Sequence, residues 1–121
     1  MSALPAIVKL AQPDAPGAVD HPRPDRLVRG NPRRQTWTLY ESGDGVSSAG
    51  IWACEPGMWR IAFAPNKQEY FFVLEGHVRL HDASGLAVDV RAGEGAVIPA
   101  GFMGAFEVVE AVRKHFVVIE R

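Results

Sequence analysis

Cysteine is nearly absent from this chain of 121 residues, because Cys54 is its single cysteine. One cysteine excludes a disulfide within the chain and any zinc site built from several cysteines. Cys54 directly follows the apolar residues Ile51, Trp52 and Ala53. This setting favours a small buried side chain.

An excess of charge of either sign is also lacking. Thirteen Lys and Arg residues face 14 Asp and Glu residues, so the formal net charge is −1. Nucleic-acid-binding domains usually carry a strongly basic surface. The nearest candidate here, Arg33–Arg34, is only a pair of residues. We therefore expect no nucleic-acid partner.

Long hydrophobic runs are missing as well. No segment approaches the ~20 apolar residues that a membrane-spanning helix needs. The apolar stretch from Ala3 to Leu10 is interrupted by Pro5 and Lys9, and no basic segment precedes it. It lacks the form of a secretory signal peptide. We therefore expect no membrane partner and a cytoplasmic location.

Proline is unevenly distributed along the chain. Six of the nine prolines precede residue 36: Pro5, Pro13, Pro16, Pro22, Pro24 and Pro32. Prolines at this density prevent helix formation and hinder strand pairing. We therefore predict an extended N-terminal arm over residues 1–35 and one folded domain over residues 36–121, a length typical of a single domain.

Short apolar segments separated by turn residues follow from residue 36 onward. Predicted strands cover residues 36–41, 46–54, 58–64, 70–74, 77–81, 86–90, 97–98 and 112–119. Segment 70–74 is apolar on both faces, which favours burial of both. No segment of useful length shows helical periodicity, and the regular spacing of short strands is typical of a sandwich or barrel. The sequence therefore predicts an all-β fold.

Two glycine-containing motifs occur at fixed spacing within this domain. The first runs from Gly57 through positions 63, 65 and Glu69 to Gly76, and the second runs from Gly93 through Pro99-Ala-Gly101 to position 104. In this spacing the chain resembles the cupin superfamily. Further motifs resemble the small single-domain group related to the cupin domain of ureidoglycine aminohydrolase: Asn31-Pro-Arg-Arg34, Trp37, Trp52-x-x-Glu55-x-Gly57 and Val112-Arg-Lys114.

The resemblance implies a single cupin barrel (a double-stranded β-helix or jelly roll) that commonly pairs as a homodimer. In metal-binding cupins, two His, one Glu and a third His hold the metal. Here the matching positions carry Phe63, Pro65, Glu69 and Gly104. Glu69 alone among them can bind a metal, and such sites usually need three or more protein ligands. We therefore expect neither a metal nor another cofactor.

The four histidines give little support to a rebuilt metal site. His77 and His81 share one strand face but lie about 13 Å apart along the strand. His21 lies in the proline-rich segment, and His115 lies on the last predicted strand. A structural or solvent-exposed role is favoured for each, and a rebuilt metal site stays the minority alternative.

The cupin register makes the barrel interior a candidate organic pocket. Side chains expected to point inward or lie near it are Ile61, Phe63, Glu69, Phe71, Val73 and Phe106. An inward Glu69 among aromatic rings would be partly desolvated, which raises a carboxyl pKa and suits general acid or base catalysis.

Two other roles are open to Glu69. It could pair with an inward cation, for which the candidates are Arg60, Lys67 and Lys114. Equally, it could only tie down the turn over residues 65–68 through backbone amides. The three tryptophans are interpreted as core or interface residues more readily than as a binding cage: Trp37, Trp52 and Trp59.

Three functions remain compatible with these residues. In the first, the barrel binds a small organic metabolite, for example a carboxylate or a nitrogen-rich compound. The second is an enzyme like ureidoglycine aminohydrolase with Glu69 as its central residue, although the missing histidines count against a direct transfer. The third is a structural or partner-binding dimeric module with a vestigial pocket.

Overall fold

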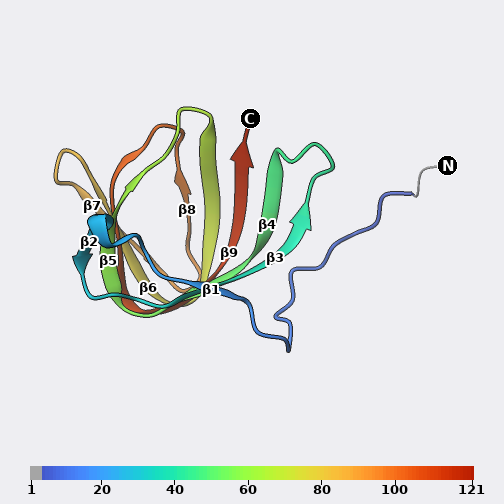
Figure 1. Ribbon diagram of the computed structural model, residues 1–121, viewed down its shortest axis with the longest axis horizontal. Coiled ribbons are helices and arrows are strands. Elements are labelled where there is room, and N and C mark those ends of the chain that lie inside the picture. Colours follow the sequence, from blue (N-terminus) through green and yellow to red (C-terminus); the bar gives the residue numbers. More distant parts are fainter. Residues whose placement is uncertain (1–3) are drawn as a thin grey trace.

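A curled sheet of nine strands forms most of the structure, a computed structural model that describes residues 4–121 (Figure 1). The elements are β1 Ala18–Asp20, η1 Pro24–Arg26, β2 Leu27–Arg29, β3 Arg34–Glu41, β4 Ser47–Cys54, β5 Gly57–Ala62, β6 Lys67–Asp82, β7 Ala87–Arg91, β8 Gly95–Ile98 and β9 Met103–Glu120. The prediction of an all-β fold is confirmed. Among the described residues, no helix has the length and apolar character to cross a bilayer.

Two long strands, β6 and β9, hold the barrel together. They are antiparallel neighbours from the pair Lys67–Glu120 to the pair Asp82–Gly104. On its other edge, β9 pairs first with β5 and then with β4. The sheet curls around these two strands, as Figure 1 shows, and one end of the curl opens to solvent.

Gly76 bends β6 without ending it. The sequence predicts a break at this glycine, but the strand continues through it, and its pairing with β9 shifts register on either side. The backbone of Gly76 has φ +90°, and a Cβ there would overlap the carbonyl oxygen of Ala111. A bulge of this kind bends a strand while its ladder continues.

Strand β9 begins nine residues before its predicted start at residue 112. Gly104, Glu107 and Glu110 interrupt the apolar pattern of this part of the chain, so its sequence does not indicate a strand. Backbone pairing on both edges, with β5 and β6, keeps it extended.

The segment over residues 70–74 is only partly buried on its outer face. Phe71 and Val73 point into the core and are fully buried. Tyr70 on the other face is 46% exposed, and Phe72 and Leu74 are half-buried. The outer face is therefore not buried within one chain, and its burial stays a prediction that depends on the expected homodimer.

The proline-rich segment contributes two strands to the sheet. Strand β1 pairs with β3, and β2 pairs with β5, while residues 4–17 contain no strand. Strand β3 already begins at Arg34, so the predicted boundary at residue 35 falls inside a strand. The indole Nε1 of Trp37 donates to the carbonyl of Ala15 at 2.9 Å, which ties the segment to the outer face of the sheet.

The interior of the curl is an apolar core. It is formed by buried side chains from six strands, chiefly Cys54, Trp59, Phe71, Val73, Val78, Leu80, Val90, Ile98, Phe106, Val108, Val112 and Phe116. Burial raises the pKa of the Cys54 thiol to about 12. The thiol is therefore a buried apolar group, in keeping with its sequence setting.

Candidate functional site

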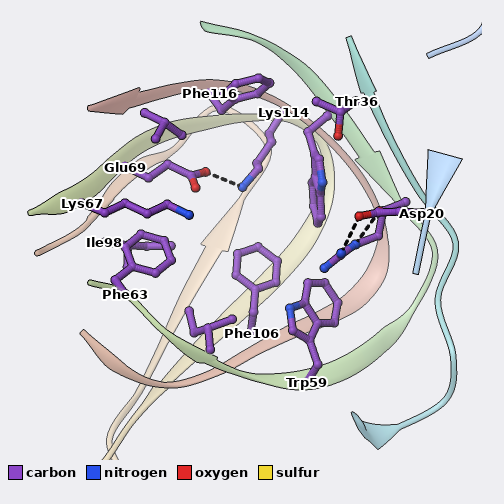
Figure 2. Close-up of a pocket in the computed structure, with 14 residues that line it drawn as sticks. Asp20, Thr36, Trp59, Phe63, Lys67, Glu69, Ile98, Phe106, Lys114 and Phe116 are labelled. Carbon is purple, nitrogen blue, oxygen red and sulfur yellow. Dashed lines mark hydrogen bonds and ion pairs between the residues drawn. The ribbon is translucent and has the colours of Figure 1, made fainter. Parts of the chain in front are cut away.

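A cavity of about 320 Å³ lies inside the open end of the barrel (Figure 2). It is lined by residues from seven strands and by Phe63 from the loop between β5 and β6: Asp20, Arg34, Thr36, Trp52, Trp59, Ile61, Phe63, Lys67, Glu69, Ile98, Phe106, Lys114, Phe116 and Val118. Small-molecule sites in proteins usually begin near this size and are mostly apolar with a few polar groups.

Three aromatic rings form one wall of the cavity. Trp59 stacks on Phe106 with ring centroids 5.3 Å apart, and Trp52 meets Phe106 edge-on at 5.6 Å. The alternation of β5 places Trp59, Ile61 and Phe63 on the same face of the chain. This wall offers an apolar surface of mutually tilted rings to a ligand.

Glu69 and Lys114 form an ion pair within the cavity. Lys114 Nζ donates to Glu69 Oε2 at 2.8 Å, and the two side chains are 6% and 13% exposed. The pairing brings together residues on β6 and β9 that are 45 positions apart. Of the three cations considered from the sequence, Lys114 is therefore the partner of Glu69.

The turn before Glu69 closes without its side chain. The backbone N–H groups of Lys67 and Gly101 both donate to the carbonyl of Ala64, at 3.1 and 3.0 Å. Among the described residues, the hydrogen bond to the Glu69 carboxylate comes from Lys114 and not from turn amides. The geometry thus favours the inward ion pair over the alternative of a turn-fixing role.

A second ion pair lies across the cavity. Arg34 binds Asp20 through both carboxylate oxygens, at 2.8 and 2.7 Å, and its guanidinium lies 5.3 Å from the centroid of the Trp59 ring. Asp20 belongs to β1, within the segment predicted as an arm. Sequence reasoning did not place either residue at the site, because their positions depend on how β1 pairs with β3.

Lys67 differs from the other two cations of the cavity. Its Nζ lies 4.6 Å from the centroid of the Phe63 ring. Among the ion pairs of residues 4–121, none joins Lys67 to a carboxylate. Figure 2 shows its side chain extended into the cavity beside Glu69.

The sequence-predicted pocket residues lie at two depths. Ile61, Phe63, Glu69, Phe106 and Lys114 line the cavity. Phe71 and Val73 are fully buried behind it, and the ring of Phe71 lies 4.4 Å from Lys114 Nζ. Trp52 and Trp59 were not expected at the site, although Trp59 shares the inward face of Ile61 and Phe63.

The residues at the cupin ligand positions do not fit a metal. Phe63 offers no donor atom, Pro65 and Gly104 do not line the cavity, and Glu69 is already bound to an ammonium group. Within residues 4–121, no group of three or more His, Cys, Asp or Glu side chains is arranged to hold a metal ion. No chemistry that needs a metal follows from this donor set.

Two of the histidines are bound to carboxylates on the outside of the barrel. His77 Nε2 lies 2.6 Å from Asp89, and His81 Nε2 lies 2.8 Å from Glu107. The hydrogen bond from His77, and then that from Arg79, lowers the pKa of Asp89. The hydrogen bond from His81 is the main cause that lowers the pKa of Glu107. These histidines have structural partners and lie outside the cavity.

A family model described as the EutQ-like cupin domain matches residues 41–116, which is more than half of the chain. The chain belongs to the EutQ-like cupin family. The predicted cupin barrel is therefore confirmed. Among curated proteins, none matches this EutQ-like cupin.

Solved structures with the same fold include several proteins of low sequence identity. A DUF861-family protein of unknown function from Pseudomonas syringae pv. tomato has a TM-score of 0.77 and 21% identity, over 92% of this chain and 46% of that protein. The EutQ-like cupin thus spans less than half of that protein's length. A putative ethanolamine utilization protein EutQ from Salmonella typhimurium has a TM-score of 0.63 and 23% identity, over 83% of this chain and 78% of that one.

Ectoine synthase from P. lautus also shares the fold. Its TM-score is 0.62 at 15% identity, over 72% of this chain and 64% of that one. Proteins of such different names on one fold show that the barrel alone does not define an activity. A function has to be inferred from the side chains that line the cavity.

Proposed function

We propose that this EutQ-like cupin binds a small organic anion in the barrel cavity, without a metal. The observation that carries the proposal is Lys67, an ammonium group directed into the cavity with no carboxylate bound to it among the described residues. An unpaired cation at the edge of a mostly apolar cavity favours a ligand with an acidic group.

The charges lining the cavity support this ligand class. Asp20 is bound to Arg34, and Glu69 is bound to Lys114. Three cations therefore face two carboxylates, and Lys67 supplies the positive charge that is left over. A ligand carboxylate would complete the pairing, whereas a cationic ligand would add to the excess.

The aromatic wall supports a flat or unsaturated ligand body. Trp52, Trp59 and Phe106 present rings at centroid distances of 5.3 to 6.2 Å from one another. Aromatic contacts of this kind favour planar groups in offset or edge-on arrangements. A small aromatic or unsaturated carboxylate is the ligand class that uses both features.

Calorimetric titration with a panel of such acids, starting with benzoate, tests the proposal. Lys67→Met should weaken binding by about tenfold or more, because a charge-assisted hydrogen bond is lost. Lys9→Met is the matched control, because Lys9 is an exposed lysine far outside the cavity lining, and it should bind like the wild type. A wild type that binds none of the acids, or a Lys67→Met variant with unchanged affinity, contradicts the proposal.

An activity like that of ureidoglycine aminohydrolase stays a second prediction, carried by the motif resemblance and by the inward position of Glu69. For Glu69 to act as a general base it would have to release Lys114, which now lies 2.8 Å away. Ammonia release from ureidoglycine that is lost in Glu69→Gln would favour this activity over simple binding.

The homodimer and the cytoplasmic location also stay predictions. The dimer is supported by exposed apolar side chains on one outer face of the sheet, where Tyr70 on β6 pairs with Val97 on β8. We expect a second copy of the chain to bury this face, because two identical sheets can pack against each other through the same patch.

A further inference from the structure

Lys114 stands beside the last metal-ligand position that the cupin motif retains. Of the four positions at residues 63, 65, 69 and 104, Glu69 alone carries a metal-binding group, and its carboxylate is 2.8 Å from Lys114 Nζ. An ion bound to the same carboxylate would face the ammonium charge at close range. The two cations therefore exclude each other.

The surroundings of Lys114 form a site for a cation. Its Nζ lies 4.5, 4.4 and 4.9 Å from the ring centroids of Trp52, Phe71 and Phe106. Aromatic faces attract cations, most strongly where water is excluded. Together with Glu69, these rings compensate a charge whose burial would otherwise be costly.

We infer that the Lys114 ammonium takes the place of a metal ion in this barrel and donates a hydrogen bond to an oxygen atom of the bound ligand. The second half of this inference rests on the proposed function. An ammonium group has three N–H donors. One of them is directed to Glu69, and the other two are shared between the surrounding aromatic faces and a ligand oxygen.

The position of Lys67 fits this role for Lys114. Figure 2 shows both lysine side chains ending in the cavity on the side of Glu69. A ligand carboxylate has two oxygen atoms, so one can accept from Lys67 and the other from Lys114. The chain thus supplies with two ammonium groups the positive charge that a metal supplies in other cupins.

Glu69 should then oppose ligand binding. Its negative charge lies next to the ammonium group and competes with a ligand oxygen for the same donor. Removal of that charge should strengthen binding, which is the reverse of the result expected for a metal ligand or a catalytic base. The sign of this effect distinguishes the inference from both alternatives.

Calorimetric titration with benzoate measures this sign. Glu69→Gln should bind benzoate about fivefold more tightly than the wild type, from the loss of one nearby like charge. Lys114→Met should bind about tenfold more weakly or worse. Unchanged or weaker binding by Glu69→Gln, or wild-type affinity in Lys114→Met, overturns the inference.

A second variant keeps the experiment informative if Lys114→Met does not fold. Lys114→Met leaves the Glu69 carboxylate buried without its partner, which can unfold a protein of this size. The double variant Glu69→Leu with Lys114→Met replaces the pair by apolar groups, a change that folded proteins often tolerate. It should bind benzoate about tenfold more weakly than Glu69→Gln.

The lysine ammonium signals in a proton–nitrogen spectrum give a readout that needs no ligand. The chain has only three lysines, Lys9, Lys67 and Lys114, and only the last is buried. The Lys114 signal should be protected from exchange, move in Glu69→Gln and stay in place when Zn²⁺ is added. A signal that Zn²⁺ displaces overturns the substitution of the metal by Lys114.

The two proposals fail in different ways. If the wild type binds benzoate through Lys67 but Lys114 variants bind equally well, the proposed function stands and the inference is wrong. If no acid binds the wild type, the proposed function and ligand donation by Lys114 both fall. In that case only the proton–nitrogen spectrum of the lysine ammonium groups shows whether Lys114 takes the place of a metal ion beside Glu69.

Discussion

Glu107 accepts hydrogen bonds from His81 at 2.8 Å and from Arg29 at 3.1 Å, and Arg79 lies 3.6 Å away. These basic neighbours, with the His81 hydrogen bond as the main cause, lower the pKa of its carboxyl from the ordinary 4.5. A carboxyl with a lowered pKa in the folded state adds stability above its unfolded pKa. That stability is lost as the pH falls through the folded value.

The variant Glu107→Gln tests this linkage. At pH 7 its free energy of unfolding should be about 1 kcal/mol below that of the wild type. The difference should shrink as the pH falls below 4.5, because the wild type then loses the charge that the variant already lacks. Urea unfolding from pH 7 to pH 3 measures it, with the exposed Glu41→Gln as the control. A constant difference across this range would show that Glu107 acts only through packing.

Residue identity alone predicted part of the candidate site. Strand alternation places Ile61 and Phe63 on one face, and the motif spacing singles out Glu69. The pairing of Glu69 with Lys114 depends on how β6 and β9 lie against each other in the curled sheet, where Glu69 is opposite Val118 and Lys114 is opposite Val73, and no local pattern encodes this. For Trp59 a signal was present, because it alternates in step with Ile61 and Phe63.

At the scale of elements, the prolines explain where the arm prediction departs from the structure. Proline hinders pairing at its own position and does not prevent a short strand between two prolines. Pro16 and Pro22 lie on either side of β1, and Pro24 and Pro32 lie on either side of β2, so both strands form in the intervals. Pro32 is fully buried, and its ring lies so close to Gly57 that a Cβ at that position would overlap it.

A substitution at Gly76 tests whether this glycine is needed for the bend in β6. Gly76→Ala adds a methyl group at φ +90° against the backbone of Ala111, so neither strand can keep its place without strain. The free energy of unfolding should fall by at least ~2 kcal/mol. Gly43→Ala is the matched control, because a Cβ there meets no atom within 4 Å. Equal urea midpoints for the two variants would contradict the account of the β6 bend.

At the scale of the whole molecule, the outer face of the sheet makes a prediction about assembly. Tyr70 is 46% exposed and its strand neighbour Val97 is 61% exposed. If this face packs against a second copy of the chain, light scattering after size exclusion should give twice the mass of one chain. Val97→Lys should shift the protein toward the monomer, because it places a charge in the contact.

The matched control is Val28→Lys, because Val28 is 50% exposed on β2 and does not share the surface hollow that Val97 lines, so it should leave the mass unchanged. A wild type that elutes with the mass of one chain would remove the predicted homodimer. A dimer that survives Val97→Lys would place the contact on another face.

The cavity should bind an organic anion through charges that the chain itself supplies. Titration of the wild type with benzoate, once after exhaustive chelation and once with added Zn²⁺ or Mn²⁺, tests it most directly. If the charges of the chain hold the anion, the affinity should be the same in both titrations, with one site per chain. Binding that appears only when a metal is added would contradict it.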